Sequence, residues 1–394
     1  MSDRSLAIIG GGPAGLAAAE AAAREGVKVT LYDAKRSVGR KFLVAGKSGL
    51  NLTHGEPMDD FVSRYKGTCE PSVPWLDLLE ETSPADLRAW ALELGIETFQ
   101  ARTGRVYPTA MKAAPLLRRW IERLRSMGVT MVMNHPWVSI DGGAPWRLGF
   151  YNGVMIEADA VVFALGGASW PQTGSDGSWL ARFQALGIPC RALQPANCGW
   201  ETAWAESVLA AAEGLPIKNI EVTAAGQRVA GELLITRYGL EGGAIYQLGH
   251  ALRGMDDPAL EIDLKPTFSV DQLLEKLGAA SGDVLAAAIR AWRLSPAAAA
   301  LLATADCANV ESLARAAKGF VVGLRGPRPI AEAISTAGGL CWSALDSTLM
   351  VRELPGCFVA GEMIDWEAPT GGYLIQGCFA TGRHAGRHAA RWLR

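Results

Sequence analysis

Three glycines and one aspartate near the N-terminus have the types and spacing that bind a dinucleotide. Gly10, Gly12 and Gly15 follow the apolar run Leu6–Ile9, and Asp33 ends the next apolar run. In this pattern the first glycine permits a tight turn, the second lets the backbone approach a pyrophosphate, and the third lets a helix pack closely on a strand. Asp33 can then accept hydrogen bonds from a ribose diol. The alternative is a glycine-rich turn that binds nothing.

The elements that must position these residues are a strand, a helix and a second strand. Residues 6–9 predict the first strand, the alanine-rich residues 16–24 a helix that ends at Gly26, and residues 27–32 the second strand. The N-terminus of such a helix faces the phosphates, where its dipole and free N–H groups favour negative charge.

A basic, glycine-rich segment follows, over residues 34–56. It contains Arg40 and Lys41, which can act as cations on a diphosphate, and it ends near His54. The alternative is a solvated basic loop.

The C-terminal part of the chain again has the pattern of a strand, glycine and an acidic residue that occurs in the N-terminal part. Residues 356–362 form an apolar run that ends in Gly361 and Glu362, and residues 376–392 predict a long helix. A carboxylate at this place can hold the ribityl chain of a flavin, and the helix N-terminus can stabilise an anionic reduced ring. The alternative is one more strand–helix unit. Arg383, Arg387 and Arg391 fall on one face of the helix and predict a solvated face.

The middle of the chain differs in character. Residues 190–268 alternate short apolar runs with turn residues, which is typical of a small antiparallel β unit. Residues 269–319 predict helices that begin at Ser269, Ser295 and Asn309. We therefore expect three parts: residues 1–189 with 325–394, a β insert over 190–268, and a helical insert over 269–324.

Composition argues against several classes of partner and of binding site. The net charge is −2, so no global attraction to a phosphate backbone is expected, and neither nucleic acid nor membrane is an expected partner. The seven cysteines include no CxxC pair, which argues against a disulfide framework, a zinc ribbon or any other metal site. No uncharged apolar stretch approaches 20 residues, so we expect a cytoplasmic protein.

Taken together, the motifs resemble one family over nearly the whole chain: the bacterial FAD-dependent oxidoreductases of the aminoacetone oxidase and BaiN/RdsA type. The motifs that carry the resemblance occur in one order: Gly10–Gly15 with Asp33, Gly39–Lys41, Gly104–Pro108, Ala164–Gly174, Thr336–Gly339, Ala360–Glu362 and Thr370–Tyr373.

The resemblance implies an α/β fold. It consists of a Rossmann-type FAD-binding domain, similar to one half of glutathione reductase, with an inserted β-barrel-like unit and a small helical domain. It also implies FAD as the cofactor, with NAD(P)H as a possible transient donor. The FAD-binding residues that we expect are Gly10, Gly12, Pro13, Ala14, Gly15, Asp33, Ala34, Gly39, Arg40, Lys41, Val138, Ala164, Gly166, Gly361, Glu362, Gly371, Gly372, Tyr373 and Leu374.

The predicted activity is hydride transfer between a small organic substrate and the flavin. The resemblance leaves an oxygen-using amine oxidase and a flavin-dependent RNA-modifying protein as alternatives. No catalytic base stands out, and the candidates are His54, Asn51, Tyr373 and Arg237. The chain departs from the family pattern at Gly49–Asn51, where many members have Arg-Cys-Asn, and at Thr236–Gly242. Because these departures lie in regions expected to contact the substrate, the resemblance does not identify the substrate of this chain.

Overall fold

The computed structural model describes residues 4–278 and 283–394. The chain forms two compact units, one from residues up to Gln194 together with Ser335–Arg394, and one from Pro195–Ile334. Each unit has its own hydrophobic core. The β-rich and helical parts of the second unit share one core. The division of the chain into three parts stays a prediction.

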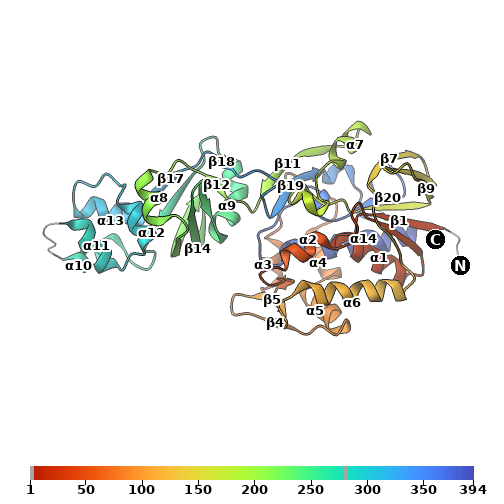
Figure 1. Ribbon diagram of the computed structural model, residues 1–394, viewed down its shortest axis with the longest axis horizontal. Coiled ribbons are helices and arrows are strands. Elements are labelled where there is room, and N and C mark those ends of the chain that lie inside the picture. Colours follow the sequence, from red (N-terminus) through yellow and green to blue (C-terminus); the bar gives the residue numbers. More distant parts are fainter. Residues whose placement is uncertain (1–3, 279–282) are drawn as a thin grey trace. The chain divides into compact units, whose positions relative to one another are not determined.

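The first unit is built on a parallel sheet of five strands, as the α/β prediction requires (Figure 1). The strand order is β20-β10-β1-β2-β6. These strands are β1 Ser5–Ile9, β2 Lys28–Tyr32, β6 Thr130–Val132, β10 Ala160–Phe163 and β20 Cys357–Val359. Both ends of the chain supply strands to this sheet, because β20 pairs with β10 and β10 pairs with β1.

Smaller antiparallel sheets and helices complete the first unit. The sheets are β3 Thr53–His54 with β5 Arg105–Pro108 and β4 Thr98–Gln100, and β7 Trp137–Gly142 with β8 Trp146–Phe150 and β9 Met155–Ala158. A third pair joins β11 Cys190–Ala196 to β19 Ser335–Leu340. The helices are α1 Pro13–Arg24, α2 Arg40–Ala45, α3 Met58–Val62, α4 Trp75–Glu81, α5 Pro84–Glu93, α6 Ala113–Ser126, α7 Trp179–Ala185 and α14 Tyr373–Trp392, with 3-10 turns η1 Pro171–Thr173, η2 Trp342–Ala344 and η3 Gly361–Met363.

The second unit contains an antiparallel sheet in the order β17-β16-β13-β14-β15-β12-β18. Its strands are β12 Trp200–Glu201, β13 Pro216–Ala224, β14 Gln227–Thr236, β15 Gly239–Glu241, β16 Ala259–Asp263, β17 Phe320–Gly323 and β18 Gly326–Pro327. Its helices are α8 Glu206–Ala212, α9 Gly243–Arg253, α10 Val270–Leu277, α11 Val284–Trp292, α12 Pro296–Leu302 and α13 Val310–Lys318. Side-chain caps at Ser269, Ser295 and Asn309 begin α10, α12 and α13, as the sequence predicts.

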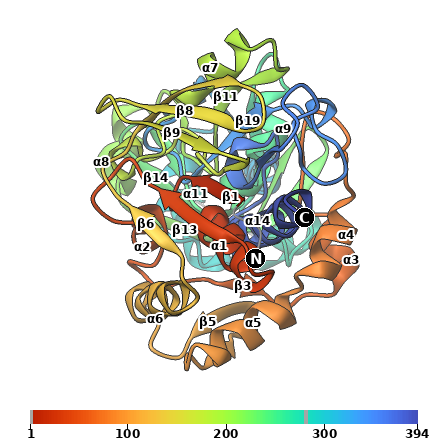
Figure 2. The ribbon, with the colours of Figure 1, turned by 90° about the vertical axis from the view of Figure 1, so that its right-hand side faces the viewer.

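Glycines let α14 lie directly against α1 (Figure 2). A Cβ atom at Gly382 would stand 2.4 Å from the Ala14 carbonyl oxygen, and one at Gly386 would stand 2.3 Å from the Ala18 carbonyl oxygen. Any larger residue at these two positions would therefore push the helices apart.

Two segments and one helix face add detail to the sequence analysis. The basic segment 34–56 contains α2 and β3, so it is not a simple loop. Residues 157–163 belong to β9 and β10, which are separated at Asp159, whose carboxylate accepts a hydrogen bond from the Ser5 backbone N–H at 2.7 Å. The arginine face of α14 is not wholly solvated, because Arg387 donates to Glu81 at 2.6 Å and of the three arginines only Arg391 is exposed.

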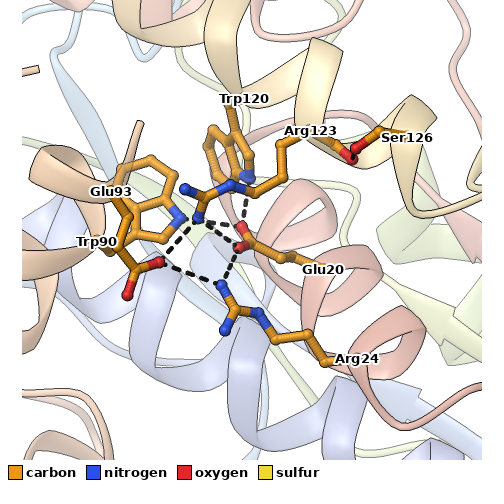
Figure 3. Close-up of polar contacts among 7 residues, drawn as sticks. All are labelled: Glu20, Arg24, Trp90, Glu93, Trp120, Arg123 and Ser126. Carbon is orange, nitrogen blue, oxygen red and sulfur yellow. Dashed lines mark hydrogen bonds and ion pairs between the residues drawn. The ribbon is translucent and has the colours of Figure 1, made fainter. Parts of the chain in front are cut away.

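A buried carboxylate joins α1 to α5 and α6 (Figure 3). Glu20 is 3% exposed and accepts indole N–H bonds from Trp90 at 2.9 Å and Trp120 at 2.7 Å. Its other oxygen accepts from Arg24 at 2.8 Å and Arg123 at 3.1 Å. Burial alone would raise the pKa of Glu20, but the hydrogen bonds from Arg24, Trp90 and Arg123 outweigh burial and hold this pKa below its ordinary value.

Replacing Glu20 by Gln should therefore destabilise the first unit by about 3 kcal/mol at pH 7, because it leaves two arginines without their buried partner. The folded-state pKa is lowered, so the stabilisation by the carboxylate is complete above the unfolded-state pKa of about 4.3 and is lost as the pH falls through the folded-state pKa. Urea denaturation at pH 7 and at acid pH measures the free energy of unfolding. The difference in this free energy between Glu20→Gln and wild type should shrink at acid pH.

The matched control is Glu122→Gln on α6, since the Glu122 side chain is 54% exposed and lies 3.7 Å from Arg119. Its effect should stay within about 0.5 kcal/mol. Equal losses in the two variants would contradict the role given to Glu20.

Candidate functional site

The glycine turn between β1 and α1 has two glycines that packing requires and one that faces open space. A Cβ at Gly10, whose φ is 109°, would stand 2.2 Å from the Ala164 carbonyl oxygen. One at Gly15 would stand 1.9 Å from the Gly10 carbonyl oxygen. At Gly12, beyond its chain neighbours, a Cβ would meet no heavy atom of the described residues within 4 Å. Gly12 also caps the N-terminus of α1, with Pro13 and Ala14 in the first turn, so a phosphate has space and free N–H groups there.

Asp33 follows β2 and is held by backbone donors. Its two carboxylate oxygens accept from the N–H groups of Gly11 at 2.8 Å and Lys35 at 2.7 Å. Burial raises the pKa of Asp33, against the hydrogen bonds and the positive charges of Arg40 and Lys35. Each carboxylate oxygen can accept a second hydrogen bond, so this orientation is compatible with a ribose diol. Ala34, next along the chain, is half-buried.

Arg40 and Lys41, which were predicted together at the diphosphate, have different surroundings. The left-handed Gly39, with φ of 69°, places both residues in the first turn of α2. The Arg40 Nε atom is buried and has no hydrogen-bond partner among the described residues. The Lys41 ammonium donates to Glu362 at 2.7 Å and to Ser169 at 2.6 Å.

Glu362 therefore lies in a polar cradle that joins distant segments. Besides Lys41, it accepts from the backbone N–H groups of Thr336 at 2.9 Å and Gly167 at 3.3 Å. The residue before Glu362 is Gly361, which packs closely against the start of α1. A Cβ at Gly361 would stand 2.7 Å from the Cβ of Ala14, so this contact helps to position Glu362. The loop that carries Gly167 turns at Gly166, with φ of 72°, two residues after the buried Ala164.

The glycine pair before α14 also makes a close backbone contact. Gly371 and Gly372 have φ of 133° and 102°, and a Cβ at Gly372 would stand 2.6 Å from the Cα of Thr53. The helix begins at Tyr373, earlier than predicted, so its N-terminus lies at the glycine pair itself. Its first turn includes the half-buried Leu374 and carries no carboxylate.

The phenol of Tyr373 is engaged by a carboxylate. It donates to Glu56 at 2.7 Å, and Arg64 makes two hydrogen bonds to the same carboxylate, at 3.0 and 2.7 Å. Burial would raise the pKa of Glu56, but hydrogen bonds from Arg64 and Tyr373 lower it below its ordinary value. Burial and Glu56 raise the pKa of Tyr373. A tyrosine in this setting stays neutral.

The three remaining catalytic candidates, His54, Asn51 and Arg237, differ in the hydrogen-bond partners that their side chains have. The His54 Nε2–H donates to the Thr103 carbonyl at 2.9 Å, and its Nδ1 accepts from the Glu56 N–H at 3.3 Å, so backbone groups satisfy both ring nitrogens. The Asn51 Oδ1 atom is buried, with no partner in the part of the chain that the structure describes. Arg237 belongs to the second unit, where its side chain is 78% exposed and pairs with Glu213.

Val138 lies in β7, where the pairing with β8 shifts register between Trp137 and Ser139. Its carbonyl accepts from Arg182 at 2.9 Å. A bulge leaves backbone groups out of the ladder, which suits a contact with adenine, and this contact stays a prediction.

Sequence reasoning missed the partners Thr336, Glu56 and Arg64. Thr336 lies in the motif 336–339 and could have been found there. No local sequence pattern could have identified Glu56 as a site residue, because its partner Tyr373 lies 317 residues away in the chain.

The residues present fit FAD. The open space at Gly12 and the unpartnered Arg40 Nε would suit a diphosphate, and the carboxylates of Asp33 and Glu362 would suit a ribose and a ribityl chain; these roles stay predictions. Across residues 4–278 and 283–394, no three His, Cys, Asp or Glu side chains are grouped so that they could hold a metal ion. Within the same ranges, no helix has the length and apolar character to cross a membrane.

The Gly12→Ala variant should keep the fold and lose FAD affinity. The φ of Gly12 is −78°, which alanine adopts readily, and its Cβ would enter the open space expected for the diphosphate. We expect the FAD Kd to rise at least about tenfold, measured by quenching of flavin fluorescence, with the melting temperature of the apoprotein unchanged.

The matched control is Gly143→Ala, at an exposed position where a Cβ also meets nothing within 4 Å of described residues. It should bind FAD as wild type does. Unchanged FAD affinity in Gly12→Ala would place the diphosphate elsewhere.

Comparisons with known proteins identify the family of this chain. The family described as HI0933-like protein Rossmann domain matches residues 4–388. A 3-dehydro-bile acid delta(4,6)-reductase of Clostridium scindens is 28% identical and is matched over 98% of both chains. A ribosomal RNA dihydrouridine synthase of Haemophilus influenzae is 22% identical over 94% of both chains.

Solved structures support the fold. A flavocytochrome c3 fumarate reductase in an open conformation is 14% identical, with a TM-score of 0.53 over 100% of this chain and 79% of that one. A 3-ketosteroid-delta4-(5alpha)-dehydrogenase of Rhodococcus jostii is 16% identical, with a TM-score of 0.50 over 99% and 98%. The predicted Rossmann-type FAD-binding fold is thus confirmed, and the chain belongs to the HI0933-like family as an FAD-dependent oxidoreductase.

Proposed function

We propose that this enzyme is a reductase that delivers a hydride to a carbon–carbon double bond conjugated to a carbonyl group in a small organic substrate. The observation that carries the proposal is the 28% identity, over 98% of both chains, to a protein named 3-dehydro-bile acid delta(4,6)-reductase. A 4,6-diene beside a 3-oxo group is a conjugated system of this kind. FAD, when bound, supplies the hydride chemistry, and the protein supplies orientation and electrostatics.

The residues of this chain have distinct parts in that reaction. Glu362 and its three donors orient the ribityl hydroxyls, and Gly371 and Gly372 allow a close approach of backbone to the ring. The N-terminus of α14 adds positive partial charge, which its first turn does not neutralise, and so favours negative charge on the ring.

A proton must also reach the carbon next to the one that accepts the hydride. His54, Asn51, Tyr373 and Arg237 stay the predicted candidates for this step. The hydrogen bonds of Tyr373 to Glu56 and of His54 to backbone groups favour positioning roles for these two.

The electron donor that we propose is NAD(P)H, bound transiently. The sequence contains one full GxGxxG motif, so FAD takes the dinucleotide site. Seven free cysteines and the use of NAD(P)H support a cytoplasmic location.

A second candidate is reduction of uridine in RNA. The Haemophilus relative is named a ribosomal RNA dihydrouridine synthase. Dihydrouridine is uridine with its 5,6 double bond reduced, and that bond is also conjugated to a carbonyl group, so the same chemistry serves both substrates. The net charge of −2 and the lower identity favour the small molecule.

The first test is anaerobic mixing of the holoprotein with NADPH and, separately, with NADH, while the visible flavin band is followed. We expect rapid bleaching with one of them, followed by return of the band when a steroid 4-en-3-one is added. Free FAD at the same concentration is the control and should bleach slowly.

Other outcomes identify the alternatives. An absence of bleaching, together with oxygen consumption and peroxide formation from aminoacetone, would contradict the reductase and indicate an amine oxidase. Bleaching followed by return of the band only with unmodified ribosomal RNA, weakened by salt, would favour the second candidate.

A further inference from the structure

Two neighbouring cations in the first turn of α2 face different groups of the protein. Lys41 reaches Glu362, which lies 321 residues away. Arg40 lies close enough to Asp33 for its charge to lower the pKa of that carboxyl group. Asp33 is the group expected at the ribose of the ADP part, and Glu362 is the group expected at the ribityl chain. The two cations therefore interact with carboxylates that we expect at opposite parts of the cofactor.

Lys41 already has two partners within the protein, a carboxylate and a buried hydroxyl. Its ammonium donates to Glu362 at 2.7 Å and to Ser169 at 2.6 Å, and Ser169 is buried. The side chains of Lys41 and Glu362 are 26% and 12% exposed, so water screens this pair weakly. If Lys41 moved to a phosphate, it would leave a largely buried carboxylate without its counter-charge, which is strongly unfavourable.

Arg40 is in the opposite situation. Its Nε–H group is buried and lacks a hydrogen-bond partner among the residues that the structure describes. A guanidinium presents its N–H groups in a planar fork that fits two oxygens of a phosphate. Gly12, at the N-terminus of α1, leaves open space for such a group.

We propose that the two cations divide the cofactor between them. Arg40 binds the diphosphate of FAD, whereas Lys41 does not contact the diphosphate and instead fixes the Glu362 carboxylate for the ribityl hydroxyls. Lys41 is thus a positioning residue that acts through Glu362. This changes the expectation from the sequence, which placed both cations at the diphosphate. The inference depends on FAD binding and is independent of the proposed substrate.

A double-mutant cycle on FAD affinity tests the division. The full-length apoprotein is reconstituted with FAD for Arg40→Met, Lys41→Met, Glu362→Gln and the doubles Arg40→Met/Glu362→Gln and Lys41→Met/Glu362→Gln. We expect each single substitution to raise the Kd by about tenfold or more. The factors for Arg40 and Glu362 should multiply, because no hydrogen bond or ion pair among the described residues joins these two side chains. The double Lys41→Met/Glu362→Gln should bind better than the product of its singles predicts.

Fragments of the cofactor give a second readout. Arg40→Met should weaken ADP-ribose and leave riboflavin within about twofold, whereas Lys41→Met should weaken riboflavin and leave ADP-ribose within about twofold, in competition against FAD. Lys47→Met, at an exposed lysine of the same segment, is the matched control and should change neither.

Circular dichroism and thermal unfolding of each apoprotein check folding. If Lys41→Met does not fold, the double variant, which removes both charges, and Lys41→Arg, which keeps the charge, replace it. The proposal is overturned if Lys41→Met weakens ADP-ribose as Arg40→Met does, or if Arg40 couples to Glu362 as strongly as Lys41 does.

Discussion

The contact of backbone with backbone around the start of α1 is the constraint on which the rest of the first unit depends. The Gly10 carbonyl oxygen would lie 1.9 Å from a Cβ at Gly15, and Gly382 approaches the Ala14 carbonyl equally directly. At these glycines the backbone of α1 meets the Gly10 turn and α14 without a side chain between them. Because Gly361 also abuts Ala14, the same contacts set the position of Glu362. The same packing therefore positions Gly12, which we expect at the phosphates, and Glu362, which we expect at the ribityl chain.

Two carboxylates of this unit illustrate how charge is accommodated in its interior. Glu20 lies in the core among two arginines and two indoles, and its four donors join three helices. Glu362 has one ammonium and two backbone donors, and it lies at the edge of the core. Full saturation makes Glu20 a structural anchor. Partial exposure leaves Glu362 able to accept a ligand hydroxyl, so the difference in burial separates the structural group from the functional one.

The sequence predicted what local physical rules determine, and it could not reveal partners that lie far along the chain. The glycine turn, β2 and the caps at Ser269, Ser295 and Asn309 depend on residues within a few positions of one another. The pairing of Lys41 with Glu362 spans 321 residues, and a basic pattern near a glycine turn points to phosphate whether or not a carboxylate lies opposite. The arginine face of α14 was wrong for the same reason, because Glu81 comes from another helix.

Tyr373, which the motif pattern predicts at the flavin ring, also has partners that lie far along the chain. Its backbone carbonyl accepts from the Tyr65 phenol at 2.8 Å, and its own phenol donates to Glu56. The hydrogen bonds from Arg64 help to lower the pKa of Glu56, so this carboxylate is ionised at neutral pH. The pKa of the Tyr373 phenol is raised, so the phenol keeps its proton at neutral pH. Both ends of Tyr373 are thus restrained, which fixes the first turn of α14 beside Gly371 and Gly372. These contacts give Tyr373 a geometric role at the start of the helix, and its predicted place at the flavin ring stays a prediction.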